Sequence, residues 1–158
     1  MPSRRKSRQR ALQLLFQLDM TSQPVEEGLA GFYGSLHSEL ATAPPQPDAF
    51  AEQLVRGVIR RKEEIDARIA RHAQNWRLER MPAVDRNLMR LAIFEMTELK
   101  APPAVAINEA LELARRFSGE EAVSFINGVL DAVRKEIGAP EPGTPRRPRR
   151  RKASEPPH

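Results

Sequence analysis

Apolar side chains recur at spacings of three and four residues along most of the chain, and prolines divide this pattern into separate stretches. Such spacing places apolar side chains on one face of an α-helix, whereas a strand requires alternation with a period of two, which no stretch shows. Proline cannot continue a helix, because it lacks the backbone N–H and its ring clashes with the preceding turn. The breaks fall at Pro24, at 44–47, at Pro82 and at Pro102-Pro103. The sequence therefore predicts an all-α fold of about six to seven helices.

The helices expected between these breaks differ in how apolar they are. We expect them over residues 3–20, 25–40, 48–69, 84–99, 107–117 and 122–137. The stretch at 84–99 is strongly apolar, so we expect it to be the central core helix. Asp48 is a good N-cap for the helix that follows it. Ser118 and Glu121 have the spacing of a capping box before the last helix.

The end of the chain has a different composition. Residues 138–158 hold six prolines and six basic side chains and almost nothing apolar. A segment that cannot bury apolar surface does not repay the entropy lost on folding. We therefore expect a single domain of two helical subdomains over residues 3–137, followed by a disordered tail over residues 138–158.

The positive charge of the chain is concentrated at its two ends. Residues 1–18 carry five basic and no acidic side chains, and residues 138–158 carry six basic and two acidic ones. The residues between them therefore have a net charge of −4 within a total of +5. A charge that served only solubility would be spread over the surface. The asymmetry indicates an anionic partner that the termini contact.

The N-terminal basic cluster runs directly into an apolar helix. Its sequence is Arg4-Arg5-Lys6-Ser7-Arg8-Gln9-Arg10. Exposed cations at the start of a helix oppose the helix dipole, at a cost of roughly 0.3–1 kcal/mol each, so folding alone would favour acidic residues there. Arginine binds two phosphate oxygens at once, and its flat face stacks on unpaired bases. The cluster therefore predicts contact with RNA, and the alternative is a solvated basic start without a partner.

The chain lacks the residue patterns on which catalysis depends. It has no cysteine, and His37, His72 and His158 show no metal-ligand spacing. No glycine-rich phosphate loop follows a strand. The acidic pairs Glu63-Glu64 and Glu120-Glu121 each point to different helix faces. We therefore expect neither an enzyme nor a cofactor or metal site.

The N-terminal region does not have the pattern of a targeting segment. Gln13, Gln17 and Asp19 interrupt the apolar residues after the basic cluster, so neither a signal-peptide core nor a membrane span can form there. The absence of cysteine fits a reducing compartment. We expect a cytoplasmic protein that makes no contact with a membrane.

Three segments carry motifs specific enough to compare with known families. They are 105–114 (VAINEALELA) with 125–130 (FINGVL), 82–86 (PAVDR) leading to 91–95 (LAIFE), and the basic cluster leading to 11–16 (ALQLLF). These segments resemble the NusB family of transcription antitermination factors. The resemblance implies an all-helical protein that binds the boxA element of nascent ribosomal RNA transcripts together with NusE, a small-subunit ribosomal protein. That complex joins RNA polymerase and prevents premature termination.

The resemblance also assigns roles to individual residues. The residues that match RNA-contacting positions of the family are Arg4, Arg5, Lys6, Arg8, Glu121 and Phe125. Phe125 could stack on a base, but one aromatic residue in an amphipathic helix is as often core packing, so both roles stay open. Phe16 and Asp85 match positions that face NusE, and Phe16 stands where the family often has tyrosine.

Two other kinds of protein share features with this chain. A helical protein-binding scaffold would have the same fold, and its basic ends would be incidental. The fold also resembles the N-terminal domain of certain ribosomal RNA cytosine methyltransferases, but those enzymes need an α/β domain with a cofactor loop and cysteines, which this chain lacks. A homodimer formed through the basic face is left open, since some members of the NusB family dimerise and so hide the RNA surface.

Overall fold

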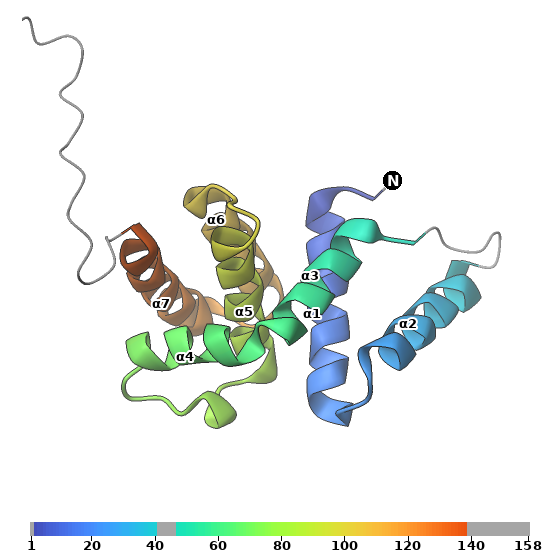
Figure 1. The fold of residues 1–158 in the computed structure, drawn as a ribbon, viewed down its shortest axis with the longest axis horizontal. Helices are drawn as coiled ribbons and strands as arrows, with labels where there is room; N and C mark the ends of the chain where they lie inside the picture. Colours follow the sequence, from blue (N-terminus) through green and yellow to red (C-terminus); the bar gives the residue numbers. More distant parts are fainter. Residues whose placement is uncertain (1, 41–46, 139–158) are drawn as a thin grey trace, which may run out of the picture.

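The computed structural model describes residues 2–40 and 47–138 of the chain (Figure 1). Its elements, in chain order, are α1 (Arg4–Thr21), α2 (Val25–Leu40), α3 (Ala49–Arg60), α4 (Lys62–His72), the 3-10 turn η1 (Leu78–Arg80), α5 (Ala83–Thr97), α6 (Pro103–Phe117) and α7 (Glu120–Gly138). These two ranges contain no strand, so the predicted all-α fold is confirmed. Residues 139–158 of the predicted tail lie outside the described residues.

Helix α5 forms the centre of the fold, as its apolar sequence predicts. It packs against α1, α3, α4, α6 and α7, and Figure 1 shows it standing between α1 and α7. Leu88, Met89 and Ile93 of this helix are completely buried. Helices α1 and α3 pack together in one half of the domain, and α4 and α7 pack together in the other. Because α5 contacts all four of these helices, it holds the two halves together.

The prediction of one helix over residues 48–69 is wrong, because the chain turns at Arg61 and forms two helices there. Arg61 has φ −102° and ψ 13°, and its N–H donates to the Gly57 carbonyl oxygen over 3.0 Å. Helix α3 packs against α1 and α5, whereas α4 packs against α5 and α7. The turn lets α3 lie against α1 and α4 lie against α7, and these two neighbours stand on opposite sides of α5 (Figure 1).

Asp48 caps α3 as predicted, and it also connects three helices. One of its carboxylate oxygens accepts from the Ala51 N–H over 3.0 Å. The same carboxylate accepts from the Ser7 hydroxyl over 2.8 Å and from Arg10 of α1 over 3.1 Å. The Asp48 N–H donates to the hydroxyl of Tyr33 in α2 over 2.9 Å. The cap therefore fixes the start of α3 against both α1 and α2.

Ser118 has a different partner from the one its capping-box spacing predicts. Its hydroxyl donates to Asp85 Oδ1 over 2.7 Å, which joins the turn between α6 and α7 to the first turn of α5. Asp85 is only 6% exposed, so its carboxylate needs a donor inside the protein. Gly119 follows with a φ of +149°, which favours glycine, and its N–H donates to the Ala114 carbonyl oxygen.

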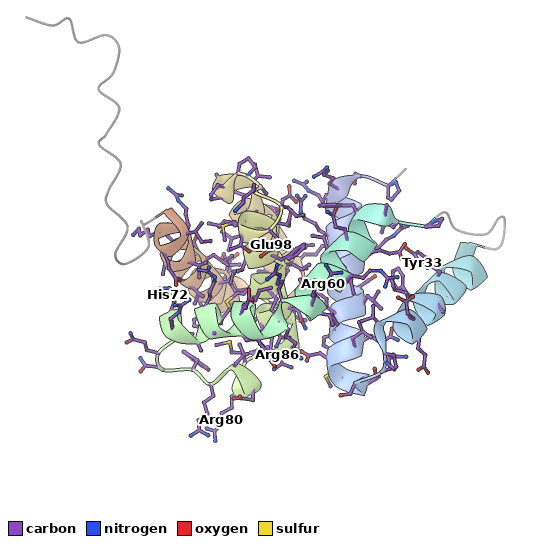
Figure 2. All side chains as sticks on the ribbon, viewed as in Figure 1. Tyr33, Arg60, His72, Arg80, Arg86 and Glu98 are labelled. Carbon is purple, nitrogen blue, oxygen red and sulfur yellow. The ribbon has the colours of Figure 1, made fainter. Side chains whose placement is uncertain are left out.

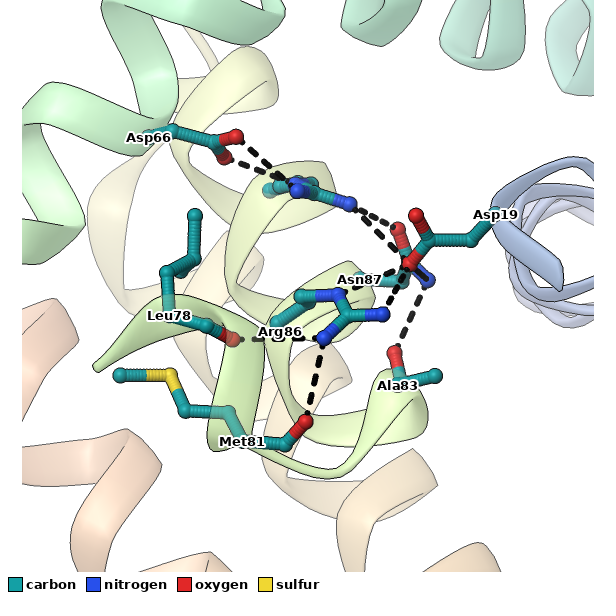
Figure 3. A network of polar contacts seen from close by, with 8 residues as sticks. Asp19, Asp66, Leu78, Met81, Ala83, Arg86 and Asn87 are labelled. Atoms are coloured by element: carbon teal, nitrogen blue, oxygen red, sulfur yellow. Dashed lines mark hydrogen bonds and ion pairs between the residues drawn. The ribbon is translucent and has the colours of Figure 1, made fainter. Parts of the chain in front are cut away.

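A network of charged groups joins α1 to α5 and α4 (Figure 3). Asp19 of α1 pairs with Arg86 over 2.7 Å and with Arg90 over 3.4 Å, and Arg90 pairs with Asp66 of α4 over 2.8 Å. Arg86 also donates to the carbonyl oxygens of Leu78 and Met81, which fixes the loop before α5. Figure 2 shows Arg86 among the helices, whereas Arg80 of η1 points away from them.

We expect Asp19 to make the stability of the fold sensitive to acid. Burial alone would raise the pKa of Asp19, but the hydrogen bond from Arg86 and the charges of Arg90 and Arg86 hold it below its ordinary value. A lowered pKa in the folded state adds stability above the unfolded pKa of about 3.9, and this stability is lost as the pH falls through the folded value. Asp19→Asn should reduce the urea-unfolding free energy at neutral pH by roughly 1–3 kcal/mol and flatten its fall below pH 4. An equally steep fall in the variant would contradict this role.

Candidate nucleic-acid interface

The first turn of α1 presents three exposed cations, Arg4, Arg5 and Lys6. Ser3 caps the helix by accepting from the Lys6 N–H over 3.1 Å, and no acidic residue lies in the first turn. The Arg4 guanidinium lies over the ring of Phe50, 4.5 Å from its centroid. These cations add to the positive end of the helix dipole, so this end of the molecule attracts anions.

Arg5 is paired at the surface with Glu109 of α6. Two hydrogen bonds of 3.2 Å each join its guanidinium to that carboxylate. The hydrogen bond to Glu109 and the negative charge of that residue raise the pKa of Arg5 above its ordinary value. The side chain is still 69% exposed, so the pair leaves most of the guanidinium open to solvent.

Arg8 points into the protein. Its Nη2 lies 2.7 Å from Glu95 Oε1, and its Nε also donates to that carboxylate. Arg8 is 7% exposed and Glu95 is 2% exposed. Arg8 therefore differs from the other predicted RNA contacts, because its guanidinium is mostly buried and is held by Glu95.

The sequence contains the signal for this inward position. Arg8 precedes Ala11, Leu12 and Leu15 by three, four and seven residues, so it lies on the buried face of α1. An arginine on an apolar face is stable only with a partner, and the sequence does not indicate which carboxylate supplies it.

A hollow of about 480 Å³ lies at the N-terminal ends of α5 and α7, and we call it the α5–α7 hollow. Its walls include Trp76, Asp85, Ser118, Glu120, Glu121 and Phe125. The structure thus brings together three residues that the resemblance divides between RNA and NusE: Asp85, Glu121 and Phe125. Glu121 is exposed, whereas Asp85 is buried beneath Ser118.

The ring of Phe125 lies at the boundary between the apolar core and the surface. It packs against the apolar core and is only partly buried. Its ring also contacts the ring of Trp76, with centroids 5.8 Å apart and planes tilted by 57°. Trp76 is 56% exposed, so this aromatic pair reaches the surface.

Arg116 stands between the basic start of α1 and the α5–α7 hollow. Its Nη1 donates to Gln9 of α1 over 3.3 Å, and its guanidinium lies 5.2 Å from the ring centroid of Phe117. Glu109, which pairs with Arg5, is separated from Ser118 at the hollow by about 14 Å along the axis of α6, since a helix rises 1.5 Å per residue. The predicted RNA contacts therefore form two separate groups along one helix.

The sequence interpretation missed Arg116 and Trp76. Arg115 and Arg116 in the last turn of α6 could have been found from their charge, although cations at that end also suit the helix dipole. Trp76 lies in a polar loop, and nothing in the local sequence shows that its ring meets Phe125. Phe16, predicted to face NusE, is 41% exposed on α1 and does not line the hollow.

Among the described residues, no group of three or more histidine, aspartate or glutamate side chains is arranged to hold a metal ion. None of the helices in those ranges is long and apolar enough to cross a membrane. His72 lies 2.9 Å from Glu136 and ties α4 to α7. That carboxylate has a lowered pKa, since its hydrogen bond to His72 and the nearby arginines outweigh the effect of burial, which would raise it.

The domain is all-helical, and it carries exposed cations at the start of α1 and an aromatic hollow at the starts of α5 and α7. These features place the chain in the class of small helical binding proteins. The model of the NusB family matches residues 5–135, which is most of the chain. The chain belongs to the NusB family of transcription antitermination proteins, which are not enzymes.

Individual relatives agree with this assignment. The transcription antitermination protein NusB of Solibacter usitatus is 55% identical over 145 residues, which cover 92% of this chain and 96% of that protein. The structure of T. maritima NusB superposes with a TM-score of 0.72 at 32% identity, covering 85% and 92% of the two chains. A chain from a complex of the antitermination factors NusB and NusE with double-stranded RNA gives 0.70 at 29% identity, covering 84% and 96%.

The Arg8–Glu95 pair should be a major determinant of folding. Arg8→Ala leaves the Glu95 carboxylate buried without its partner, and we expect a loss of roughly 3–5 kcal/mol in the free energy of unfolding by urea. The control Arg4→Ala removes an exposed arginine and should change stability by less than about 0.5 kcal/mol. Arg8→Met combined with Glu95→Leu should recover most of the loss. If Arg8→Ala and Arg4→Ala are equally stable, the pair does not have this role.

Proposed function

We propose that this protein binds boxA RNA of nascent ribosomal RNA transcripts together with NusE, and that the complex acts with RNA polymerase to prevent premature termination. The observation that carries the proposal is the exposure of Arg4, Arg5 and Lys6 at the positive end of α1, with no acidic residue in that turn. The related complex of NusB and NusE with RNA supports the choice of partners. Transcription takes place in the cytoplasm of bacteria, so we propose that location.

The basic start of α1 suits phosphate groups better than bases. Its cations lie at the positive end of a helix, where anions are favoured, and an arginine fork matches two phosphate oxygens. The Phe50 ring limits the positions of the Arg4 guanidinium, which reduces the entropy lost on binding. In this proposal Arg8 does not contact phosphate directly: it anchors the start of α1 through Glu95.

The second group of predicted contacts suits bases. Glu121 cannot bind phosphate favourably, but a carboxylate accepts hydrogen bonds from the amino groups of bases, and Phe125 offers a ring edge at the surface. Arg116 lies between the two groups and suits an intervening phosphate. We therefore propose that a single RNA strand runs along α6 from the start of α1 to the α5–α7 hollow.

NusE has a surface of its own in this proposal. Phe16 is 41% exposed, and Phe117, on the neighbouring α6, is 40% exposed. Exposed aromatic residues of this kind are typical anchors of protein interfaces. Asp85 matches a position that faces NusE, and Ser118 holds its carboxylate in the wall of the hollow. A second copy of the chain on the basic start would compete with RNA for the same cations.

The preference for boxA can be measured by fluorescence anisotropy. Labelled boxA RNA and a scrambled RNA of equal composition are titrated at physiological salt, with and without NusE. We expect tighter binding of boxA and a larger difference between the two RNAs when NusE is present. Equal weak binding of both RNAs in both conditions would favour the helical scaffold whose basic ends are incidental.

The salt dependence of binding tests the basic start directly. Each phosphate of single-stranded RNA neutralised by a cation contributes about −0.7 to the slope of log affinity against log salt. Replacing Arg4, Arg5 and Lys6 by alanine should therefore reduce the magnitude of the slope by about two. The matched control replaces Arg60, Lys62 and Arg134, which are exposed on α3, α4 and α7, and should leave the slope unchanged. Equal slopes for the two triple variants would refute the phosphate contacts.

A further inference from the structure

We propose that the α5–α7 hollow is a binding pocket for one unpaired nucleobase that carries an exocyclic amino group, with Trp76 as the stacking surface. The inference rests on the proposed function, because it names what part of an RNA strand the hollow receives. Trp76 is thereby added to the residues that contact RNA, and the pocket is expected to prefer some bases over others.

Trp76 is held at the surface by the fold of its loop. The backbone N–H of Trp76 donates to the Ala73 carbonyl oxygen over 3.0 Å, and the indole ring packs against the ring of Phe125. Arg86 fixes the following residues by donating to the carbonyl oxygens of Leu78 and Met81. The tryptophan is therefore presented in one position although its side chain is 56% exposed. A large, positioned and exposed aromatic face is the kind of surface on which unpaired bases stack.

The shape of the hollow suits a small planar group. Its volume of about 480 Å³ lies within the usual range for small-molecule sites. The tilt of 57° between the two aromatic rings leaves them at an angle, so a planar group can lie on one face and meet the edge of the other. Pro82 and Ala122 complete the apolar wall.

The charges of the hollow determine which part of an RNA strand enters it. Asp85 lies in the first turn of α5, and Glu120 and Glu121 lie in the first turn of α7, where helix dipoles favour ionised carboxylates. Ionised carboxylates accept hydrogen bonds and cannot donate them. They therefore repel phosphate, and they favour a base edge with N–H donors, such as the amino group of cytosine or adenine.

The position of the hollow favours a base over a side chain of a protein partner. Arg116 lies two residues before Ser118, which forms part of one wall of the hollow. Arg116 also donates to Gln9, which follows the exposed cations of α1. A strand whose phosphates are held by these cations has its bases next to the hollow. The cations thus receive the phosphate groups, and the carboxylates of the hollow receive a base.

Trp76 is the single tryptophan of the chain, so its fluorescence reports on the hollow directly. The test titrates the full chain with short oligo(C) and oligo(U) of equal length at fixed salt and neutral pH. Cytosine and uracil have rings of the same size. At position 4 cytosine has an amino group and uracil an oxygen, and at position 3 cytosine has a bare nitrogen and uracil an N–H, so the exocyclic amino donor is present in cytosine alone. We expect oligo(C) to quench Trp76 emission and to bind more tightly than oligo(U). Equal quenching and equal affinity would overturn the predicted base preference.

Variants separate stacking from hydrogen bonding. In anisotropy titrations with labelled oligo(C), Trp76→Ala should weaken binding by about tenfold, as expected for the loss of one base–aromatic stack, whereas Trp76→Phe should retain most of the affinity. Val105→Ala, at an exposed apolar residue on α6 outside the hollow, is the control and should have no effect. Glu121→Gln should reduce the preference for oligo(C) while quenching persists, because the amide can also donate to uracil.

The outcomes distinguish this inference from the proposed function. If RNA binds with the expected salt slope but Trp76→Ala binds like the wild type, the base pocket is refuted and the proposed function stands. If no RNA binds in any condition, both fail. If NusE alone quenches Trp76 and RNA does not, the hollow receives a protein side chain and the base pocket is refuted.

Discussion

Helix α5 has other helices around it, so most of the polar side chains that it carries are buried and must be paired inside the protein. The partners come from different elements: Arg8 of α1 for Glu95, Asp19 of α1 for Arg86, Asp66 of α4 for Arg90, and Ser118 of the α6–α7 turn for Asp85. Apolar packing gives α5 its central place. The polar pairs then specify the position of each neighbour along it.

Two of these pairs also shape the candidate interface. Arg8 is used to hold α1 against α5, which leaves Arg4, Arg5 and Lys6 at the surface on the turn before it. The bond between Ser118 and Asp85 closes one wall of the α5–α7 hollow and keeps the start of α7 beside the start of α5. The same interactions that stabilise the fold thus decide which charges reach the surface at the start of α1 and which residues line the hollow.

Apart from Glu109 and Glu112, which pair with Arg5 and Arg115, the positive and negative groups of the interface are separated along α6. Cations gather at the start of α1 and at Arg116, and carboxylates gather at the starts of α5 and α7. A uniformly basic surface would bind any polyanion through its phosphates. A basic region followed by an aromatic hollow with carboxylates can also discriminate between bases, which is what recognition of a defined RNA element requires.

The sequence by itself determined the helices, their proline breaks, the Asp48 cap, the basic start and the family, because these follow from neighbours within a turn or from short motifs. The tertiary structure alone decided that Arg8 pairs with Glu95, that the chain bends at Arg61, that Ser118 pairs with Asp85 and that Trp76 meets Phe125. Arg8 and Glu95 are 87 residues apart, and Ser118 and Asp85 are 33 apart. Periodicity shows which face of a helix is buried, but the partner of a buried charge depends on which distant helix packs against that face.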